Sequence, residues 1–333
     1  MLDTQIQALC DRFPDLSWKQ QEVLAPYTFM KVGGPSSLFV EIRTVEELFS
    51  VTSFCFLQHI PFRILGGASN VIIADEGLDC LVIHNLTSEI TVSPKGDRTY
   101  EVTTDSGVIT ALLANRTMEQ GLSGLEYFVG VPGTIGGAVV NNSHFTAQDL
   151  IGNAVSAVEV CSIDGKRETL AVEHLKFDYD YSIFHERKDV VLRVTFQLKK
   201  DNIENIRERV KAAALKRTQT QPIGIPSSGC MYRNPIITLD QLISIKRKIS
   251  IPEHAYHSRT DGSIQIAAGF LIDRAGLKGE RVGDVQVSEK HATYMINVGK
   301  ATAHDIEALC ARVESKVLET FGVQLEHEVF FLK

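Results

Sequence analysis

Apolar and polar residues follow two different periods in the first part of this chain. Residues 38–42 form an alternating apolar run, which predicts a strand. Thr44 and Glu47, three residues apart, match a capping box, so we expect a helix over about 45–58. A short apolar run at 62–65 predicts a second strand that ends in a glycine turn. Strand, helix and strand in this order predict a small α+β unit.

The same two periods predict the remaining elements. Apolar runs predict strands over 71–73, 80–84, 101–104, 139–140, 155–162 and 190–197, and a closing strand over 323–332 that carries Glu328. Helical spacing predicts helices over 109–120, 202–216, 267–276 and 303–321, whereas 236–264 is a polar segment. A chain of 333 residues is longer than one core usually takes, so we expect α+β domains over 1–85, 86–205 and 206–333.

A glycine-rich stretch lies near the middle of the chain and interrupts these patterns. Gly130-Val-Pro-Gly-Thr-Ile-Gly-Gly-Ala138 suits neither a regular helix nor a strand. A rigid loop with free amides and little side-chain bulk suits a pyrophosphate, and a tight structural turn is the alternative. No Gly-Lys-Ser/Thr follows it, so it is not a P-loop, and it lacks the acidic residue of the dinucleotide fingerprint.

A second glycine turn, Gly66-Gly-Ala-Ser-Asn70, precedes it by about 60 residues. Its amides, with the Ser69 hydroxyl and the Asn70 amide, suit phosphate or ribose oxygens. An ordinary turn would have the same composition. The recurrence of two such loops favours a nucleotide ligand.

Composition and charge exclude several classes of protein. The net charge of −7 argues against nucleic-acid binding as the main activity. The N-terminus lacks the pattern of a signal peptide, and no apolar run approaches the ~20 residues of a membrane span. None of the six cysteines forms a CxxC pair, so we expect no metal site, reduced thiols and a cytoplasmic location.

Two residues in the last third of the chain are candidates for proton transfer. Cys230 follows a glycine in a polar loop with Arg233 nearby, although a buried structural cysteine would fit as well. Glu328 occupies an alternation position, where most glutamates are solvated, and His291 is more simply a structural histidine. Basic residues around the glycine turns of this region suggest an anion site: Arg217, Arg233, Lys278, Arg281 and Lys290.

The order of motifs resembles the UDP-N-acetylenolpyruvoylglucosamine reductase family of flavoenzymes. The matching segments span nearly the whole chain: LAPYTFMKVGG (24–34), LGGASN (65–70), GLSGLEYFVGVPGTIGGAVVNN (121–142), FDYDYSIF (177–184), QPIGIPSSGCMYRNP (221–235), AAGFLIDRAGLKG (267–279), VSEKHATYMIN (287–297) and FGVQLEHEV (321–329). The resemblance implies an α+β fold: two FAD-binding subdomains (1–85 and 86–205) of the vanillyl-alcohol oxidase type and a C-terminal α/β substrate domain (206–333).

The resemblance also implies cofactors and site residues. The expected cofactors are FAD and NADPH, and the expected FAD contacts are Lys31, Gly66, Gly67, Ala68, Ser69, Asn70, Gly130, Pro132, Gly133, Thr134, Gly136 and Gly137. Expected contacts to the UDP-sugar enolpyruvyl ether are Tyr179, Arg217, Asn234, Lys278 and Glu289. We expect a monomer.

In this family NADPH reduces the flavin, and hydride then adds to the vinyl carbon of the substrate. Negative charge moves into the substrate carboxylate, and the adjacent carbon takes a proton. The family usually places a serine where this chain has Cys230, and a thiol is intrinsically the stronger acid. Glu328 matches the family glutamate that assists this step.

One position departs from the family pattern. Asp180 stands where the family has an arginine near the substrate carboxylate, and a carboxylate there would oppose the growing negative charge. Arg187 or Lys188 could replace that arginine. The departure leaves two alternatives open: a flavoprotein of the same fold acting on another small molecule, or a nucleotide-binding relative without catalysis.

Overall fold

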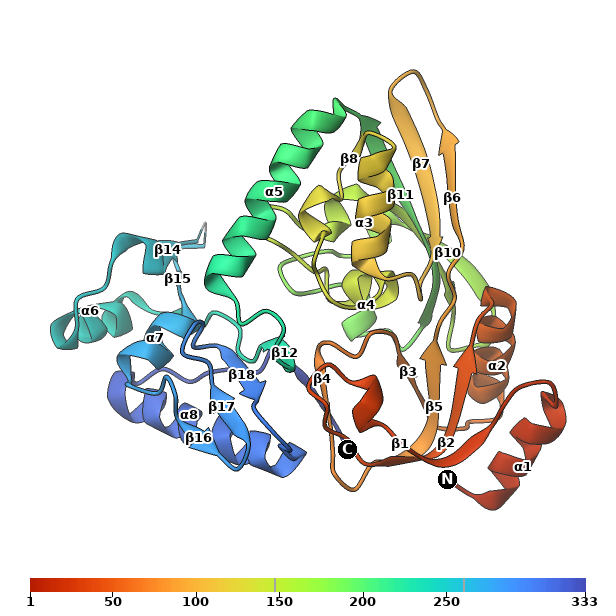
Figure 1. Cartoon of the computed structure of the whole chain (residues 1–333), viewed down its shortest axis with the longest axis horizontal. Helices are drawn as coiled ribbons and strands as arrows, with labels where there is room; N and C mark the ends of the chain where they lie inside the picture. The colour runs from red at the N-terminus through yellow and green to blue at the C-terminus, as the bar shows by residue number, and fades with distance from the viewer. Residues whose placement is uncertain (147, 260) are drawn as a thin grey trace. The chain divides into compact units, whose positions relative to one another are not determined.

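The computed structural model describes residues 1–146, 148–259 and 261–333, and the chain forms two compact units. The N-terminal unit comprises Met1–Glu22, Pro35–Ala68 and Leu78–Lys216, and the C-terminal unit comprises Val23–Gly34, Ser69–Gly77 and Arg217–Lys333. Helices and strands are mixed in both units, which confirms the α+β class (Figure 1). The predicted boundaries after residues 85 and 205 stay predictions.

The first sheet of the N-terminal unit has the strand order β1-β2-β5-β3. Its strands are β1 (Lys19–Val23), β2 (Pro35–Ile42), β5 (Leu78–Asn85) and β3 (Phe62–Leu65), and β5 pairs in parallel with β2 and β3. Helix α2 (Val45–Leu57) begins at the predicted capping box and buries Leu48, Val51 and Cys55 in the same core as this sheet, and α1 (Asp3–Arg12) adds Leu9. This part of the pattern is confirmed.

The second sheet of the same unit is antiparallel and has the order β10-β9-β11-β7-β6, with β8 paired to β11. Its strands are β10 (Arg167–Ala171), β9 (Val155–Cys161), β11 (Val190–Lys200), β7 (Thr99–Asp105), β6 (Ile90–Pro94) and β8 (Leu122–Ser123). Helix α3 (Thr110–Glu119) and helix α4 (Ile135–Val140) bury apolar side chains in the core of this sheet, and α5 (Ile203–Thr220) follows β11.

The strand predicted over 139–140 is wrong, because these residues end helix α4. Thr134 is the N-cap residue, and Ala138 and Val139 are buried. A run of two apolar residues cannot distinguish a buried strand from a buried helical turn. The glycine-rich stretch therefore passes directly into a helix.

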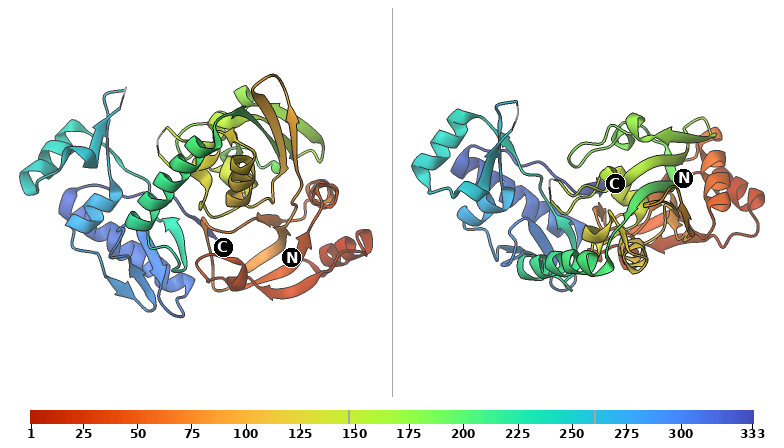
Figure 2. Two further views of the ribbon diagram at one scale, coloured as in Figure 1. Left: turned by 45° about the horizontal axis from the view of Figure 1, so that its top comes forward. Right: turned by 90° about the horizontal axis from the view of Figure 1, so that it is seen from above.

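The C-terminal unit contains an antiparallel sheet with the order β12-β18-β17-β16. Its strands are β12 (Ser227–Cys230), β18 (Tyr294–Asn297), β17 (Val285–Val287) and β16 (Arg281–Val282). Helix α8 (Ala303–Phe321) packs against β16 and β17, as Figures 1 and 2 show from different sides. The helix buries Ile306, Leu309, Val313 and Val317 in one core with this sheet.

The polar segment 236–264 contains regular structure that the sequence pattern did not predict. It holds β13 (Ile236–Ile237), α6 (Leu239–Lys248) and β14 (Tyr256–Ser258), and β15 (Ile264–Ile266) pairs with both strands. The missed signal was a capping box, Thr238 with Gln241, ahead of Leu242 and Ile245. The next helix, α7 (Ala268–Arg274), is confirmed.

The closing strand is shorter than predicted. Strand β19 covers only Phe330–Leu332 and pairs in parallel with β4 (Val71–Ile73), so Glu328 precedes it. Within the described segment 323–329, His327 forms an isolated bridge with Tyr232, and Asn70 Nδ2 donates to the Glu328 carbonyl. Among the described residues, none of the helices is long and apolar enough to cross a membrane.

Asn297 provides a test of how the segment Val23–Gly34 is held in the C-terminal unit. It is 5% exposed; its Nδ2 donates to the Met30 carbonyl at 3.0 Å, and its Oδ1 accepts from the Gly299 and Ala301 amides. We expect Asn297→Ala to lower the free energy of unfolding by about 2–3 kcal/mol, because it leaves these groups unsatisfied. Denaturant unfolding measures the loss, and Asn205→Ala, at an exposed helical position, is the control. Equal stability of the two variants would contradict this account.

Candidate functional site

The two glycine loops lie directly against each other within the N-terminal unit. A Cβ placed on Gly67 would lie 2.6 Å from the Cα of Gly133, and one placed on Gly66 would lie 2.2 Å from the Thr134 hydroxyl oxygen. Neither position can accommodate a side chain without moving the other loop. The structure therefore brings together the Gly66–Ala68 and Gly130–Gly137 segments that the sequence singled out.

A buried polar network supports the second loop from behind. Asn85 donates from Nδ2 to the Ser106 hydroxyl at 2.8 Å, and its Oδ1 accepts from Thr87. The carbonyl of Ser106 then accepts the Gly136 amide at 2.8 Å. This chain of hydrogen bonds fixes the position of the second loop relative to the strands behind it. The sequence pattern did not predict it, because Asn85, Thr87 and Ser106 lie far from Gly130–Gly137 in the sequence.

The hydrogen bonds also correct one expectation. The first two amides of α4, at Ile135 and Gly136, donate to the carbonyls of Val108 and Ser106, so they are not free for a ligand. The open part of the loop lies elsewhere. A Cβ on Gly137 would meet nothing nearer than 4.0 Å, and one on Gly130 nothing within 4 Å. A small-residue surface with room beside it fits a pyrophosphate, which needs close backbone approach.

The first loop contains a strained residue. Ala68 has a φ of 44°, in the left-handed region that residues with a side chain rarely adopt. The next residues, Ser69 and Asn70, belong to the C-terminal unit. Lys31 also belongs to that unit; it has a φ of 61°, and its Nζ donates to the Pro26 carbonyl at 2.9 Å. The cofactor roles of these residues stay predictions.

A second group of candidate residues surrounds Tyr294 in the C-terminal unit. Cys230 pairs with Tyr294 across strands β12 and β18. Burial raises the pKa of Tyr294, the neighbouring Cys230 and Glu328 raise it further, and the Arg217 guanidinium acts in the opposite direction. Three predicted site residues from distant parts of the sequence therefore lie within electrostatic reach of one phenol. Tyr294 itself was missed, although it stands in the quoted segment 287–297.

A hydrogen-bond chain leads to the Cys230 sulfur. Thr293 donates from its hydroxyl to Cys230 Sγ at 3.3 Å, and the same hydroxyl lies 2.7 Å from Nδ1 of His291. Burial lowers the pKa of His291, and Lys278 lowers it further, so the ring is neutral at neutral pH. Since the hydroxyl has one proton, Nδ1 donates to Thr293 when Thr293 donates to sulfur. The arrangement can pass a proton toward the thiol.

The backbone around Glu328 is held from two sides. Its amide donates to the Met231 carbonyl at 2.9 Å, and its carbonyl accepts from Asn70 Nδ2 at 3.2 Å. Arg217 is 8% exposed, and burial lowers its pKa. The Glu328 backbone is therefore held in place, and Arg217 contributes a buried guanidinium to the same unit.

Three of the predicted substrate contacts have structural partners. Asn234 accepts the Ala268 amide at 3.0 Å and so caps α7, and Lys278 pairs with Asp273 at 3.3 Å. Glu289 covers Gly279, where a Cβ would lie 2.3 Å from its Oε1. Their contacts to a substrate stay predictions.

Asp180, the departure from the family pattern, lies in the N-terminal unit beside a histidine. It is 7% exposed with a φ of 52°, and its Oδ1 lies 3.1 Å from His144 Nδ1. The His144 ring is 4.5 Å from that of Tyr179. Arg187 pairs with Asp189 and Glu168, so the expectation that it replaces the missing arginine is not supported, and Lys188 is exposed.

The fold and the paired glycine loops define a dinucleotide-binding α+β protein, and comparison with known proteins agrees. Residues 36–171 match a family described as FAD binding domain, and residues 221–332 match the C-terminal domain of UDP-N-acetylenolpyruvoylglucosamine reductase. Proteins named UDP-N-acetylenolpyruvoylglucosamine reductase from Chlamydia pneumoniae and Desulfosudis oleivorans are 34% and 35% identical, over 91% and 93% of this chain and 88% and 93% of theirs.

A solved structure gives the same result. The crystal structure of UDP-N-acetylenolpyruvylglucosamine reductase from Thermus caldophilus superposes with a TM-score of 0.74 at 31% identity, and the match covers 96% of this chain and all of that one. The chain belongs to the UDP-N-acetylenolpyruvoylglucosamine reductase family, and its cofactor is FAD.

Gly137 tests the predicted cofactor cradle without disturbing the fold. Because a Cβ there would make only an ordinary contact, 4.0 Å from the Thr134 hydroxyl oxygen, we expect Gly137→Ala to leave the melting temperature of the protein nearly unchanged. The methyl group would occupy space predicted for FAD, so FAD affinity should fall about tenfold. Fluorescence titration of deflavinated protein measures the affinity, and Gly96→Ala, in open space and far along the sequence, is the control. Unchanged affinity for both variants would remove Gly137 from the cofactor site.

Proposed function

We propose that this protein reduces UDP-N-acetylglucosamine enolpyruvate to UDP-N-acetylmuramate for peptidoglycan synthesis, with NADPH as the reductant. The family membership supports this activity. The observation in this chain that carries it is the pairing of Cys230 with Tyr294 across β12 and β18, with Arg217 and Glu328 within electrostatic reach of the same tyrosine. These groups include a proton donor and a fixed cation, which is what the protonation of a carboxylate-conjugated carbon requires.

Bound FAD supplies hydride chemistry, and the residues of this chain perform the other tasks. The glycine loops, 66–70 and 130–137, hold the cofactor. Arg217 orients the anionic substrate and balances the charge that develops in its carboxylate. Cys230 donates the proton, and the Thr293 hydroxyl returns one to its sulfur. Nδ1 of His291 then reprotonates Thr293 while Nε2 of the same ring takes up a proton from solvent, so the imidazole stays neutral. Glu328 assists from a backbone position fixed by Asn70 and Met231.

The protein acts on small molecules, and we propose that it does so as a cytoplasmic monomer. All six cysteines are free thiols in the structure, which supports a reducing compartment. No specific observation favours another substrate. The carboxylate of Asp180 motivated that alternative, and its Oδ1 lies 3.1 Å from Nδ1 of His144.

Cys230→Ala tests the proton donor. We expect the variant to keep its flavin and to be reduced by NADPH at the normal rate, while turnover falls about 10²–10⁴-fold because the carbon acceptor lacks its proton source. Anaerobic stopped-flow absorbance separates the two half-reactions. Cys10→Ala, at a partly exposed cysteine of the other unit, is the matched control. A Cys230→Ala variant that reoxidises normally with the enolpyruvyl substrate would exclude Cys230 as the donor.

Thr293→Val tests the hydrogen-bond chain that leads to the thiol. The substitution keeps the shape of the side chain and removes its hydroxyl, so we expect kcat to fall about tenfold with little change in KM. Thr293→Ser should restore most of the rate because it restores the hydroxyl. Steady-state kinetics across pH provide the measurement, and a parallel loss in both variants would indicate a packing role instead.

A further inference from the structure

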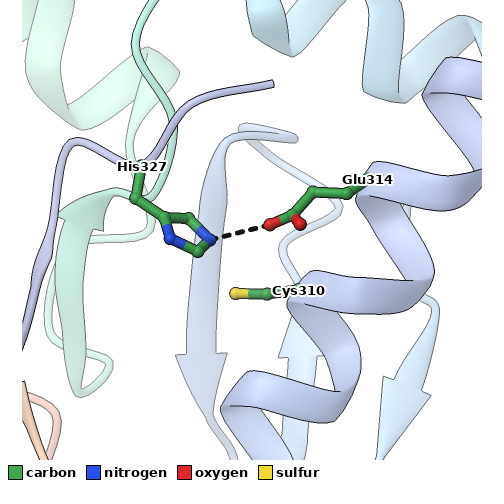
Figure 3. A group of neighbouring side chains, drawn as sticks. All are labelled: Cys310, Glu314 and His327. Atoms are coloured by element: carbon green, nitrogen blue, oxygen red, sulfur yellow. Dashed lines mark ion pairs between the residues drawn. The ribbon is translucent and has the colours of Figure 1, made fainter. Parts of the chain in front are cut away.

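Three potential metal ligands converge in the C-terminal unit at a place that the proposed reaction does not use. Cys310 and Glu314 lie one turn apart on α8, and His327 comes from the segment that precedes β19 (Figure 3). One ligand atom of each residue lies within 4.8 Å of the others, and His327 Nε2 is 2.7 Å from Glu314 Oε1. The expectation of no metal site rested on the absence of CxxC pairs. That criterion does not detect a Cys and a Glu four residues apart on one helix.

The donor set is that of a zinc site. Zinc binds thiolate sulfur at about 2.3 Å and imidazole nitrogen or carboxylate oxygen at about 2.0–2.2 Å. Tetrahedral ligands at those bond lengths lie about 3.3–3.8 Å apart, so the observed atoms need move only slightly to enclose an ion. A second sulfur is close by, since Met295 Sδ lies 3.7 Å from Cys310 Sγ.

Neighbouring groups orient the ligands. The Tyr232 hydroxyl lies 3.3 Å from Glu314 Oε1 and 3.2 Å from the carbonyl of Cys310. The His327 ring stacks on Tyr232 with centroids 5.4 Å apart and contacts Phe331 on the β19 side at 4.9 Å. Such surrounding contacts hold ligand side chains in position before a metal arrives.

The cluster is also accessible from one side. The side chains of His327 and Glu314 are 36% and 35% exposed, whereas Cys310 is 2% exposed. An ion can therefore reach the imidazole and the carboxylate first and the sulfur last. This combination of an open entrance and a buried soft ligand differs from an ordinary surface ion pair.

We propose that Cys310, Glu314 and His327 form a binding site for one zinc ion. The Cys310 thiol loses its proton to solvent as the sulfur–zinc bond forms, and the Glu314 carboxylate binds through oxygen. The His327 imidazole binds through Nε2 with one ring proton on Nδ1, any second ring proton also passes to solvent, and water fills the fourth position. No oxidation or reduction takes place. The ion joins α8 to the segment before β19.

A metal bound at this site would also restrain the backbone next to Glu328. Only the catalytic importance of that restraint rests on the proposed function. The segment 326–328 runs beside 231–233, with the Arg233 amide donating to the Glu326 carbonyl at 3.0 Å and the Glu328 amide to Met231 at 2.9 Å. A metal on His327 would therefore restrain the two hydrogen-bonded segments, 231–233 and 326–328, that position Cys230 and Glu328.

Zinc uptake by the tag-free, FAD-loaded full chain tests the site independently of turnover. After dialysis against a chelator, the protein is equilibrated with zinc ions, and bound metal and flavin are counted by elemental analysis and absorbance. We expect one zinc ion per chain, and a loss of affinity of about 100-fold or more in Cys310→Ala and in His327→Ala. X-ray absorption at the zinc edge should show one sulfur neighbour at about 2.3 Å.

Matched controls separate this site from adventitious binding. Cys55→Ala removes another buried thiol, and His304→Ala removes an exposed histidine from the same helix, so both should bind zinc like the parent protein. If Cys310→Ala does not fold, His327→Ala still tests the site, because the exposed His327 side chain can be removed without opening the core. Equal uptake by His327→Ala and the parent, or a zinc shell without sulfur, would overturn the proposal. Zinc binding in a protein without reductase activity would instead refute only the proposed function.

Discussion

The contact between the backbones of Gly67 and Gly133 is the constraint on which the predicted cofactor site depends. Two loops about 60 residues apart can meet at this distance only because neither carries a Cβ at the contact. The polar network behind them, from Asn85 through Ser106 to the Gly136 amide, fixes the position of the second loop. Together these interactions make a rigid, small-residue surface, which a ligand with many phosphate oxygens can approach closely.

The segment that precedes β19 connects different parts of the C-terminal unit. His327 forms the isolated bridge with Tyr232, and Glu328 follows it at a bend of the chain. His327 pairs with Glu314 and stacks on Tyr232, while Glu328 lies within electrostatic reach of Tyr294 together with Cys230. One short segment thus serves two separate groups of residues. Because the two groups share the backbone of residues 327 and 328, a displacement of one side chain can shift the other.

The sequence predicted more of the fold than of the contacts within the site. Capping residues and apolar spacing located α2 and α8 to within a residue, because these signals are local. The pattern failed at α4 and at segment 236–264, where the apolar runs are short. Cys230, Arg217 and Glu328 were candidates from their residue types and from the family motifs, but their positions relative to Tyr294 depend on tertiary structure, which a single sequence does not encode locally. The same reason explains why Thr293, His144 and the Cys310 cluster were missed.

In the proposed reaction, a cysteine as the proton donor makes a supporting hydroxyl more important than a serine would. Sulfur is a weak hydrogen-bond donor and acceptor, so the direction of its proton is poorly fixed by its own contacts. Thr293 can donate to the sulfur after proton transfer and accept from the thiol before it, because a hydroxyl has one donor and two acceptor sites. His291, kept neutral by burial, can follow either state through Nδ1. Under the proposed mechanism, the replacement of an alcohol by a thiol is therefore accommodated by Thr293 and His291, which would control the reprotonation of Cys230 between turnovers.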